Sequence, residues 1–211
     1  MDLFQRQLIY IPMLHDPWRE ANYDPESKEV VEKVLGPHKN SIQEKLDKYW
    51  DMTAYYLLDQ KIDKIYLDSY YGYNDFFRQR PNILTAMCVN SLLNKGSKIM
   101  PTESAEIVEK YFKKFLKIRF LKNMSEEDIA TLNANNLKQR DRYVNNQVDS
   151  TLQYDEKGIL LLGYKHKAHE IIESSTDIKI IHSPYTSLLK NISDIVEKSF
   201  ISYRLDLRND L

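Results

Sequence analysis

The sequence predicts an α/β fold, in which a mostly parallel central sheet of about five strands is flanked by helices. Short apolar runs alternate along the chain with longer segments that have helical spacing. The apolar runs lack the polar alternation of a half-exposed strand, which indicates a sheet covered on both faces. Three runs carry this pattern clearly and two more weakly: residues 8–14, 64–67 and 159–162, then 98–100 and 178–181.

The helices are predicted from amphipathic spacing and from residues that favour helix ends. Residues 40–58 have apolar side chains at helical spacing. Pro81 favours the start of a helix over 82–93, and Thr102 opens a helix to about residue 121. Ser125, followed by three acids, is a strong N-cap for a helix over 126–152.

A last helix is expected to begin at Ser183 or Ser187 and to end near residue 203, with the polar tail 204–211 fraying. The predicted order is then β-α-α-β-α-β-α-α-β-α-β-α. This alternation is typical of a parallel sheet with helical crossovers.

Length and composition exclude several classes of protein. The 211 residues suit a single domain over 1–211, and 30 basic residues against 31 acidic ones argue against a nucleic-acid binder. No run approaches the roughly 18 apolar residues of a membrane span, and the N-terminal residues are too polar for a signal peptide. The single Cys88 is interpreted as a buried core thiol rather than a nucleophile, and it favours a reducing, cytoplasmic location.

Polar side chains that can bind metal or carry protons follow every predicted strand. Ligands of parallel sheets bind at the carboxyl ends of the strands, so these side chains predict a site there. In strand order along the chain they are His15 with Asp16, Asp68, Glu103, then Lys165, His166 and His169, and last His182.

These residues also have structural interpretations, and a single histidine after a strand, such as His15, is more often a surface or hydrogen-bonded residue. Glu103 suits a helix start, and Asp68 suits the cap of the turn that follows it. His166 and His169 form an H-x-x-H pair, which is weak as a zinc signal. His182 precedes Ser183-Pro184 and suits a turn.

Arg140 lies in the most charged part of the long helix over 126–152. Four charges in five residues, Lys138, Arg140, Asp141 and Arg142, usually indicate a solvated helix face. The alternative is that Arg140 faces inward, where it would hold a substrate carboxylate or orient a metal-bound acid.

Taken together, these motifs resemble the TraB/Tiki superfamily, which is related to ChaN and the erythromycin-esterase-like proteins. Residues 163–166, GYKH, match the second of two G-x-x-H motifs, and Arg140-Asp141 matches an R-[ND] helix motif before it. Residues 9–18, IYIPMLHDPW, resemble the first motif, and 63–68, DKIYLD, resembles a strand that ends in an acid. The resemblance covers about residues 8–182.

The chain departs from the family pattern at three positions. Pro12 replaces the first glycine, Asp68 stands where glutamate is usual, and Gln139 replaces a glutamate that often precedes the arginine. Aspartate shortens the reach of the carboxylate by one methylene, which bears on a metal site more than on the fold.

The resemblance implies a hydrolase that cleaves an amide or ester bond of a peptide or small molecule, assisted by a divalent ion such as Mn²⁺, Co²⁺ or Zn²⁺. His15, Asp68 and His166 would be metal ligands or acid–base groups, and Arg140 their electrostatic partner. Further residues are expected around them: Glu103, His169 and His182.

Two other functions stay open at this stage. A family member that has lost the chemistry would be a binding or regulatory module, which holds a small anion through Arg140, Lys165 and His166. The tyrosine-rich stretch 68–77, DSYYGYNDFF, would be a protein interface or only cover the site.

Overall fold

The computed structural model describes residues 5–14, 25–68, 83–107, 109–110 and 126–209, and it confirms the predicted α/β class. Five parallel strands form one sheet in the order β3-β2-β4-β1-β5. The strands are β1 (Gln7–Met13), β2 (Lys64–Leu67), β3 (Lys98–Met100), β4 (Lys157–Gly163) and β5 (Lys179–His182).

β4 and β1 form the centre of the sheet. Gln7 pairs with Lys157 at the start of both strands, and β4 pairs on its other side with β2. Six of the seven residues in each central strand are buried, which explains why these runs are apolar throughout. The edge strands β3 and β5 have no buried residue, and these were the two runs with the weaker strand pattern.

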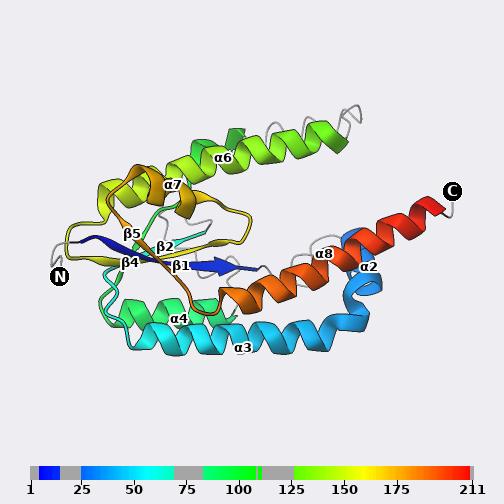
Figure 1. Ribbon diagram of the computed structural model, residues 1–211, viewed down its shortest axis with the longest axis horizontal. Helices are drawn as coiled ribbons and strands as arrows, with labels where there is room; N and C mark the ends of the chain where they lie inside the picture. Colours follow the sequence, from blue (N-terminus) through cyan, green and yellow to red (C-terminus); the bar gives the residue numbers. More distant parts are fainter. Residues whose placement is uncertain (1–4, 15–24, 69–82, 108, 111–125, 210–211) are drawn as a thin grey trace.

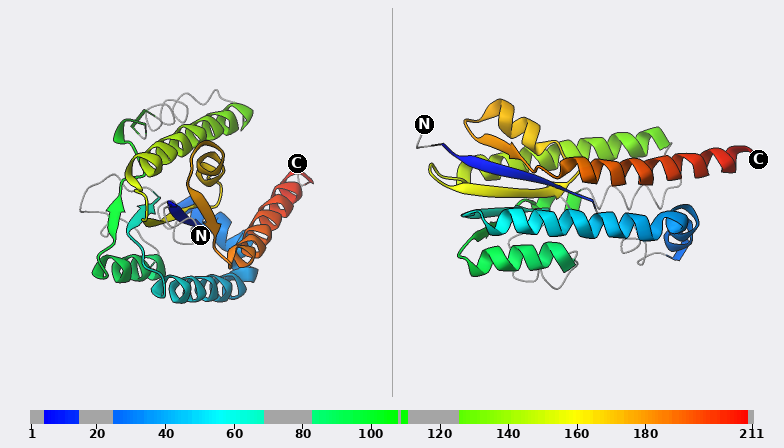
Figure 2. Two further views of the ribbon diagram at one scale, coloured as in Figure 1. Left: turned by 60° about the vertical axis from the view of Figure 1, so that its left-hand side comes forward. Right: turned by 60° about the horizontal axis from the view of Figure 1, so that its bottom comes forward.

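Helices cover both faces of this sheet (Figures 1 and 2). α6 and α7 lie on one face, and α3, α4 and α8 lie on the other. The helices are α2 (Pro25–Leu35), the 3-10 helix η1 (Gly36–His38), α3 (Lys39–Leu58), α4 (Ile83–Asn94), α6 (Glu126–Thr151), α7 (Ala168–Ser175) and α8 (Thr186–Asn209).

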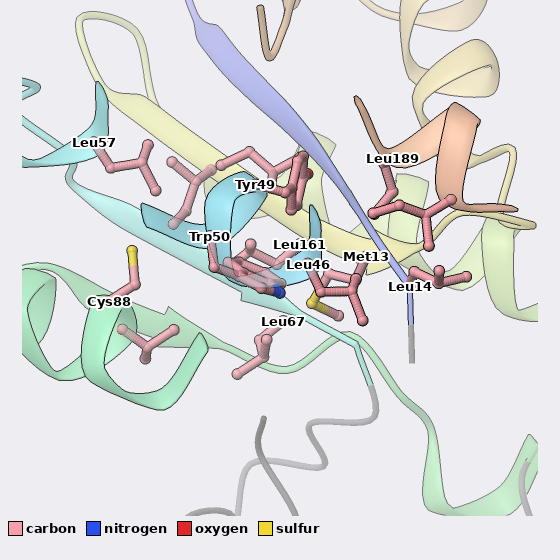
Figure 3. Packing of buried hydrophobic residues seen from close by; sticks show 14 of the residues in the cluster. Met13, Leu14, Leu46, Tyr49, Trp50, Leu57, Leu67, Cys88, Leu161 and Leu189 are labelled. Carbon is pink, nitrogen blue, oxygen red and sulfur yellow. The ribbon is translucent and has the colours of Figure 1, made fainter. Parts of the chain in front are cut away.

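Alternation along the central strands divides the core into two layers. Ile9 and Leu161 belong to the layer under α3, α4 and α8, where Tyr49 and Trp50 are the largest side chains (Figure 3). Residues at the alternate strand positions, such as Leu160, face α6 and α7. Because both faces of the sheet pack against helices, the sheet is held in a fixed position between them. The carboxyl ends of the strands are therefore fixed relative to the helices as well.

Most predicted elements are present with small changes at their ends. The strands over 64–67 and 98–100 are confirmed to the residue, and the element order is the one predicted. Of the helix predicted over 102–121, the described residues 105–107 and 109–110 are helical. Residues 102–104 are described and are not helical, so the start predicted at Thr102 is wrong. Residues 108 and 111–121 of that prediction lie outside the described residues, as do Pro81 and Ser125.

The predicted end of the last helix near residue 203 is wrong. α8 continues to Asn209, through part of the tail that was expected to fray. Leu205, Leu207 and the arginines beside them are good helix formers, so the polar composition alone was a poor signal for the helix end. Among the helices described, none is long and apolar enough to cross a membrane.

Candidate functional site

Five polar side chains from four parts of the chain meet at the carboxyl edge of the sheet. Asp68 follows β2, Glu103 lies beyond β3, His166 follows β4, and α6 supplies Arg140 and Asp141. We call these five residues the acid–histidine cluster. Each of its three acids and its histidine is buried, with no more than 7% of the residue exposed.

His166 is held in one orientation by Asp141. Its Nδ1 lies 2.5 Å from Asp141 Oδ1, and the other carboxylate oxygen accepts the backbone N–H of Lys167 at 2.9 Å. The backbone N–H of His166 donates to the Gly163 carbonyl, which fixes the turn after β4. Because a carboxylate only accepts hydrogen bonds, the proton of a neutral imidazole belongs on Nδ1, and Nε2 presents a lone pair.

Asp68 faces that second nitrogen. Its Oδ1 lies 3.8 Å from His166 Nε2 and accepts a hydrogen bond from Arg140 Nη2 at 3.0 Å. Its Oδ2 accepts the backbone N–H of Gly163 at 3.1 Å. β2 and β4 are neighbours in the sheet, and this adjacency brings the ends of the two strands together.

Arg140 faces inward and binds two acids. Its Nε donates to Glu103 Oε1 at 2.7 Å, and its Nη2 contacts both Glu103 Oε1 and Asp68 Oδ1. The solvated-face interpretation is therefore wrong for Arg140 and Asp141, although it holds for Lys138 and Arg142, which are exposed.

Glu103 has one oxygen that Arg140 does not use. Oε2 is buried and has no hydrogen-bond partner among the residues that the structure describes. Burial raises the pKa of this carboxyl above its ordinary value, and the bonds from Arg140 act in the opposite direction. Glu103 is thus more than a helix-start charge, because it positions the guanidinium that holds Asp68.

Of the three predicted metal ligands, Asp68 and His166 lie within the described residues, and their role as ligands stays a prediction. His15 lies outside the described residues, as does Asp16. The 3.8 Å between Asp68 Oδ1 and His166 Nε2 suits two ligands of one ion, since zinc bonds to such atoms are about 2.0–2.2 Å long. Among the described residues no group of three metal-binding side chains has a suitable arrangement. Asp68 and His166 therefore fit as two ligands that would need a third.

His169 and His182 were expected around the site but lie in a separate contact. The His169 ring stacks on Tyr10 with centroids 3.9 Å apart, and His182 lies edge-on to both rings. We call Tyr10, His169 and His182 the histidine stack. His166 instead bonds to Asp141, so the two histidines of the H-x-x-H pair have different partners.

Sequence reasoning missed two of the residues that the structure brings into these contacts. The sequence analysis assigns Asp141 to a charged run and to the R-[ND] motif, and to no site. Tyr10 lies in the apolar run over 8–14, and the sequence analysis gives its hydroxyl group no role. In both cases the signal was a polar group within a segment that was assigned another role.

The arrangement does not favour an anion. Lys165 is exposed, with its ammonium 5.8 Å from the centroid of the Tyr164 ring, and Arg140 is engaged by two acids. Three carboxylates in the acid–histidine cluster would repel a bound anion. Residues 69–77 of the tyrosine-rich stretch lie outside the described part of the chain.

No protein-family model matches this chain, and the searches found no curated protein and no solved structure with significant similarity to it.

Proposed function

We propose that this chain is a hydrolase of the TraB/Tiki type that cleaves an amide or ester bond of a peptide or small molecule. One observation carries the proposal: Asp141 orients His166 so that Nε2 faces Asp68 in a buried cluster at the carboxyl edge of a parallel sheet. This pairing of an imidazole with an orienting carboxylate is the arrangement that general bases and metal-binding histidines share.

In the general-base form of the proposal, Nε2 of His166 takes a proton from water as the water oxygen attacks the carbonyl carbon. Asp141 stabilises the imidazolium that forms. When the bond from carbon to the leaving nitrogen or oxygen breaks, the imidazolium returns its proton to that atom. Arg140 keeps Asp68 in place throughout, through the bond at 3.0 Å.

Asp68 and His166, with His15 as the third predicted ligand, would hold a divalent ion. When bound, such an ion supplies an activated water and polarises the substrate carbonyl. In that form of the proposal Asp141 orients a metal ligand instead of a base. A reducing location such as the cytoplasm belongs to the proposal, since the only cysteine is a buried, free thiol.

His166→Asn tests the role of Nε2 with little disturbance of the fold. The asparagine amide can replace Nδ1 as the donor to Asp141, but it has no atom at the position of Nε2. The matched control is His38→Asn, because His38 is exposed in η1 and lies outside both the acid–histidine cluster and the histidine stack. Both variants and the wild type are assayed on peptide anilides and nitrophenyl esters, with Mn²⁺, Co²⁺, Zn²⁺ or chelator.

We expect turnover in the wild type and in His38→Asn, and loss of turnover in a His166→Asn variant that stays folded. Metal content measured by mass spectrometry separates the two forms, because a ligand role predicts loss of bound metal together with activity. Equal turnover by wild type and His166→Asn would reject the proposal.

A binding or regulatory module that has lost the chemistry is the second candidate. His166 exposes only 5% of its surface, and Arg140 already balances part of the acid charge, which favours a closed, inert cluster. Asp68→Glu restores the side-chain length usual in the resembling family. Activity that appears only in this variant would support the second candidate. Strong activity in the wild type would reject the second candidate.

A further inference from the structure

The histidine stack joins α7 to the edge of the sheet. Tyr10 of β1 and His182 of β5 are register partners, so their side chains lie beside each other on one face. From α7, His169 lies on Tyr10 with an interplanar angle of 12°. Ala168 and Ile172 of the same short helix are fully buried, and together with the stack they attach α7 to this face.

His169 is poorly placed to carry a charge. Its Nδ1 is buried and, within the described part of the chain, has no hydrogen-bond partner. Burial, and then the neighbouring His182, lower its pKa from the ordinary 6.5, while three acids act weakly in the opposite direction. The charged or titratable groups around it are His182 on β5, Tyr10 on β1, Asp141 on α6, and Glu170 and Glu173 on α7 itself.

The start of α7 is bonded to the acid–histidine cluster. Asp141 accepts the backbone N–H of Lys167, the N-cap residue of α7, and it bonds Nδ1 of the preceding His166. Any displacement of α7 from the sheet therefore moves the two groups that Asp141 holds.

We propose that the histidine stack is a pH-sensitive contact: proton uptake by His169 weakens the packing of α7 and thereby loosens the hold of Asp141 on His166. A protonated His169 would bury an N–H donor without an acceptor and would place a positive charge beside His182. The proposal does not depend on hydrolase activity, because it concerns the attachment of α7.

The direction of the effect follows from proton linkage. The neutral form of His169 is favoured in the folded state, so the unfolded chain binds its proton at higher pH. The contribution is therefore complete above pH 6.5 and is lost as the pH falls toward the lower pKa of the folded state. Histidine side chains change their charge between about pH 5 and pH 8, a range that includes physiological pH.

Amide hydrogen exchange over residues 164–176 tests the proposal. The exchange rates at neutral pH and at about pH 5 are compared after correction for the intrinsic effect of pH on exchange. His169→Phe keeps an aromatic ring on Tyr10 but cannot take up a proton. His169→Gln is a second neutral variant in case the phenyl ring packs poorly, and His38→Gln changes a histidine of η1, away from the stack.

In the wild type and His38→Gln, we expect exchange in this segment to rise by more than about twofold on acidification, while the central strands stay protected. Both His169 variants should lose this rise. A wild-type segment with equal protection at both pH values, or an unchanged rise in both His169 variants, would overturn the proposal.

Discussion

Asp141 and His166 are 25 residues apart in the chain, yet a hydrogen bond of 2.5 Å joins them beneath the carboxyl edge of the sheet. Asp141 also accepts the Lys167 backbone N–H, so a single side chain ties α6 to the start of α7. Asp141 and His166 are both buried, and the hydrogen bond between their side chains is buried with them. The pair therefore contributes to stability whatever reaction the site performs.

Asp141→Asn should lower the free energy of unfolding by about 1–3 kcal/mol, because the bonds to a buried charged acceptor are weakened. Urea denaturation measures the loss. Asp51→Asn is the matched control, since Asp51 is exposed on α3, and it should change stability by less than about 0.5 kcal/mol. Equal effects of the two variants would contradict a structural role for the Asp141–His166 bond.

Arg140→Ala removes the one cation that contacts both Asp68 and Glu103 among the described residues. Their side chains are 5% and 2% exposed, so two carboxylates would stay buried without this partner. We expect a loss of about 3–5 kcal/mol in unfolding free energy. Arg142→Ala, on the exposed face of the same helix, should cost less than about 0.5 kcal/mol. Similar midpoints for both variants in thermal and urea unfolding would show that the ion pairs add little.

Gly158→Ala should also destabilise the fold, for a steric reason. A Cβ at this position would lie 2.9 Å from Leu8 Cδ1 and 3.1 Å from Tyr66 Cε2, inside the layer under α6 and α7. Overpacking of this kind costs about 1–3 kcal/mol. At Gly36 the nearest atom to an added Cβ is Glu32 Oε2 at 3.8 Å, so Gly36→Ala is the tolerated control. Calorimetry that ranks the two substitutions in the reverse order would contradict this packing.

Cys88 should be unreactive in the native protein. The residue is 6% exposed in the layer under α3, α4 and α8, and burial raises the pKa of its thiol to about 11. At pH 8 only roughly a thousandth of such a thiol is ionised, and that fraction is covered. A chromogenic disulfide reagent should label Cys88 slowly at neutral to mildly alkaline pH and at once in denaturant. Immediate labelling of the folded protein would instead indicate an accessible thiol.

The fold was predictable because a strand that is buried on both faces appears in the sequence as a short, continuous apolar run. The run over 159–162 has no polar residue, and the structure places it between two strands and two helical layers. The end of α8 was not predictable in the same way, because residues 204–209 are mostly polar but include leucine and arginine, which have good helix propensity. α7 has only eight residues, too few for a clear periodic pattern, so its bounds could not be set from the sequence.

The sequence allowed us to predict which residues gather at the ends of the strands. It did not allow us to predict which of their side chains bond to each other. Asp68 and His166 follow neighbouring parallel strands, so any such sheet brings them close. The partners of Arg140 and Asp141 depend on how α6 is rotated against the sheet, which a run of alternating charges does not determine. The contact between His169 and Tyr10 likewise depends on how α7 packs against the sheet. The H-x-x-H spacing did not show that His166 and His169 would have different partners.

The position of β4 between β1 and β2 also has a consequence for synthesis on the ribosome. The neighbours of β1 in the sheet are β4 and β5. Gln7 pairs with Lys157, so β1 cannot pair with β4 until the ribosome has synthesised residue 157 and the residues after it. Until then an apolar strand stays without its neighbours in the nascent chain. Such long sequence separations slow folding and expose the strand to aggregation. Chains that stop before residue 157 should therefore need chaperones far more than the completed protein does.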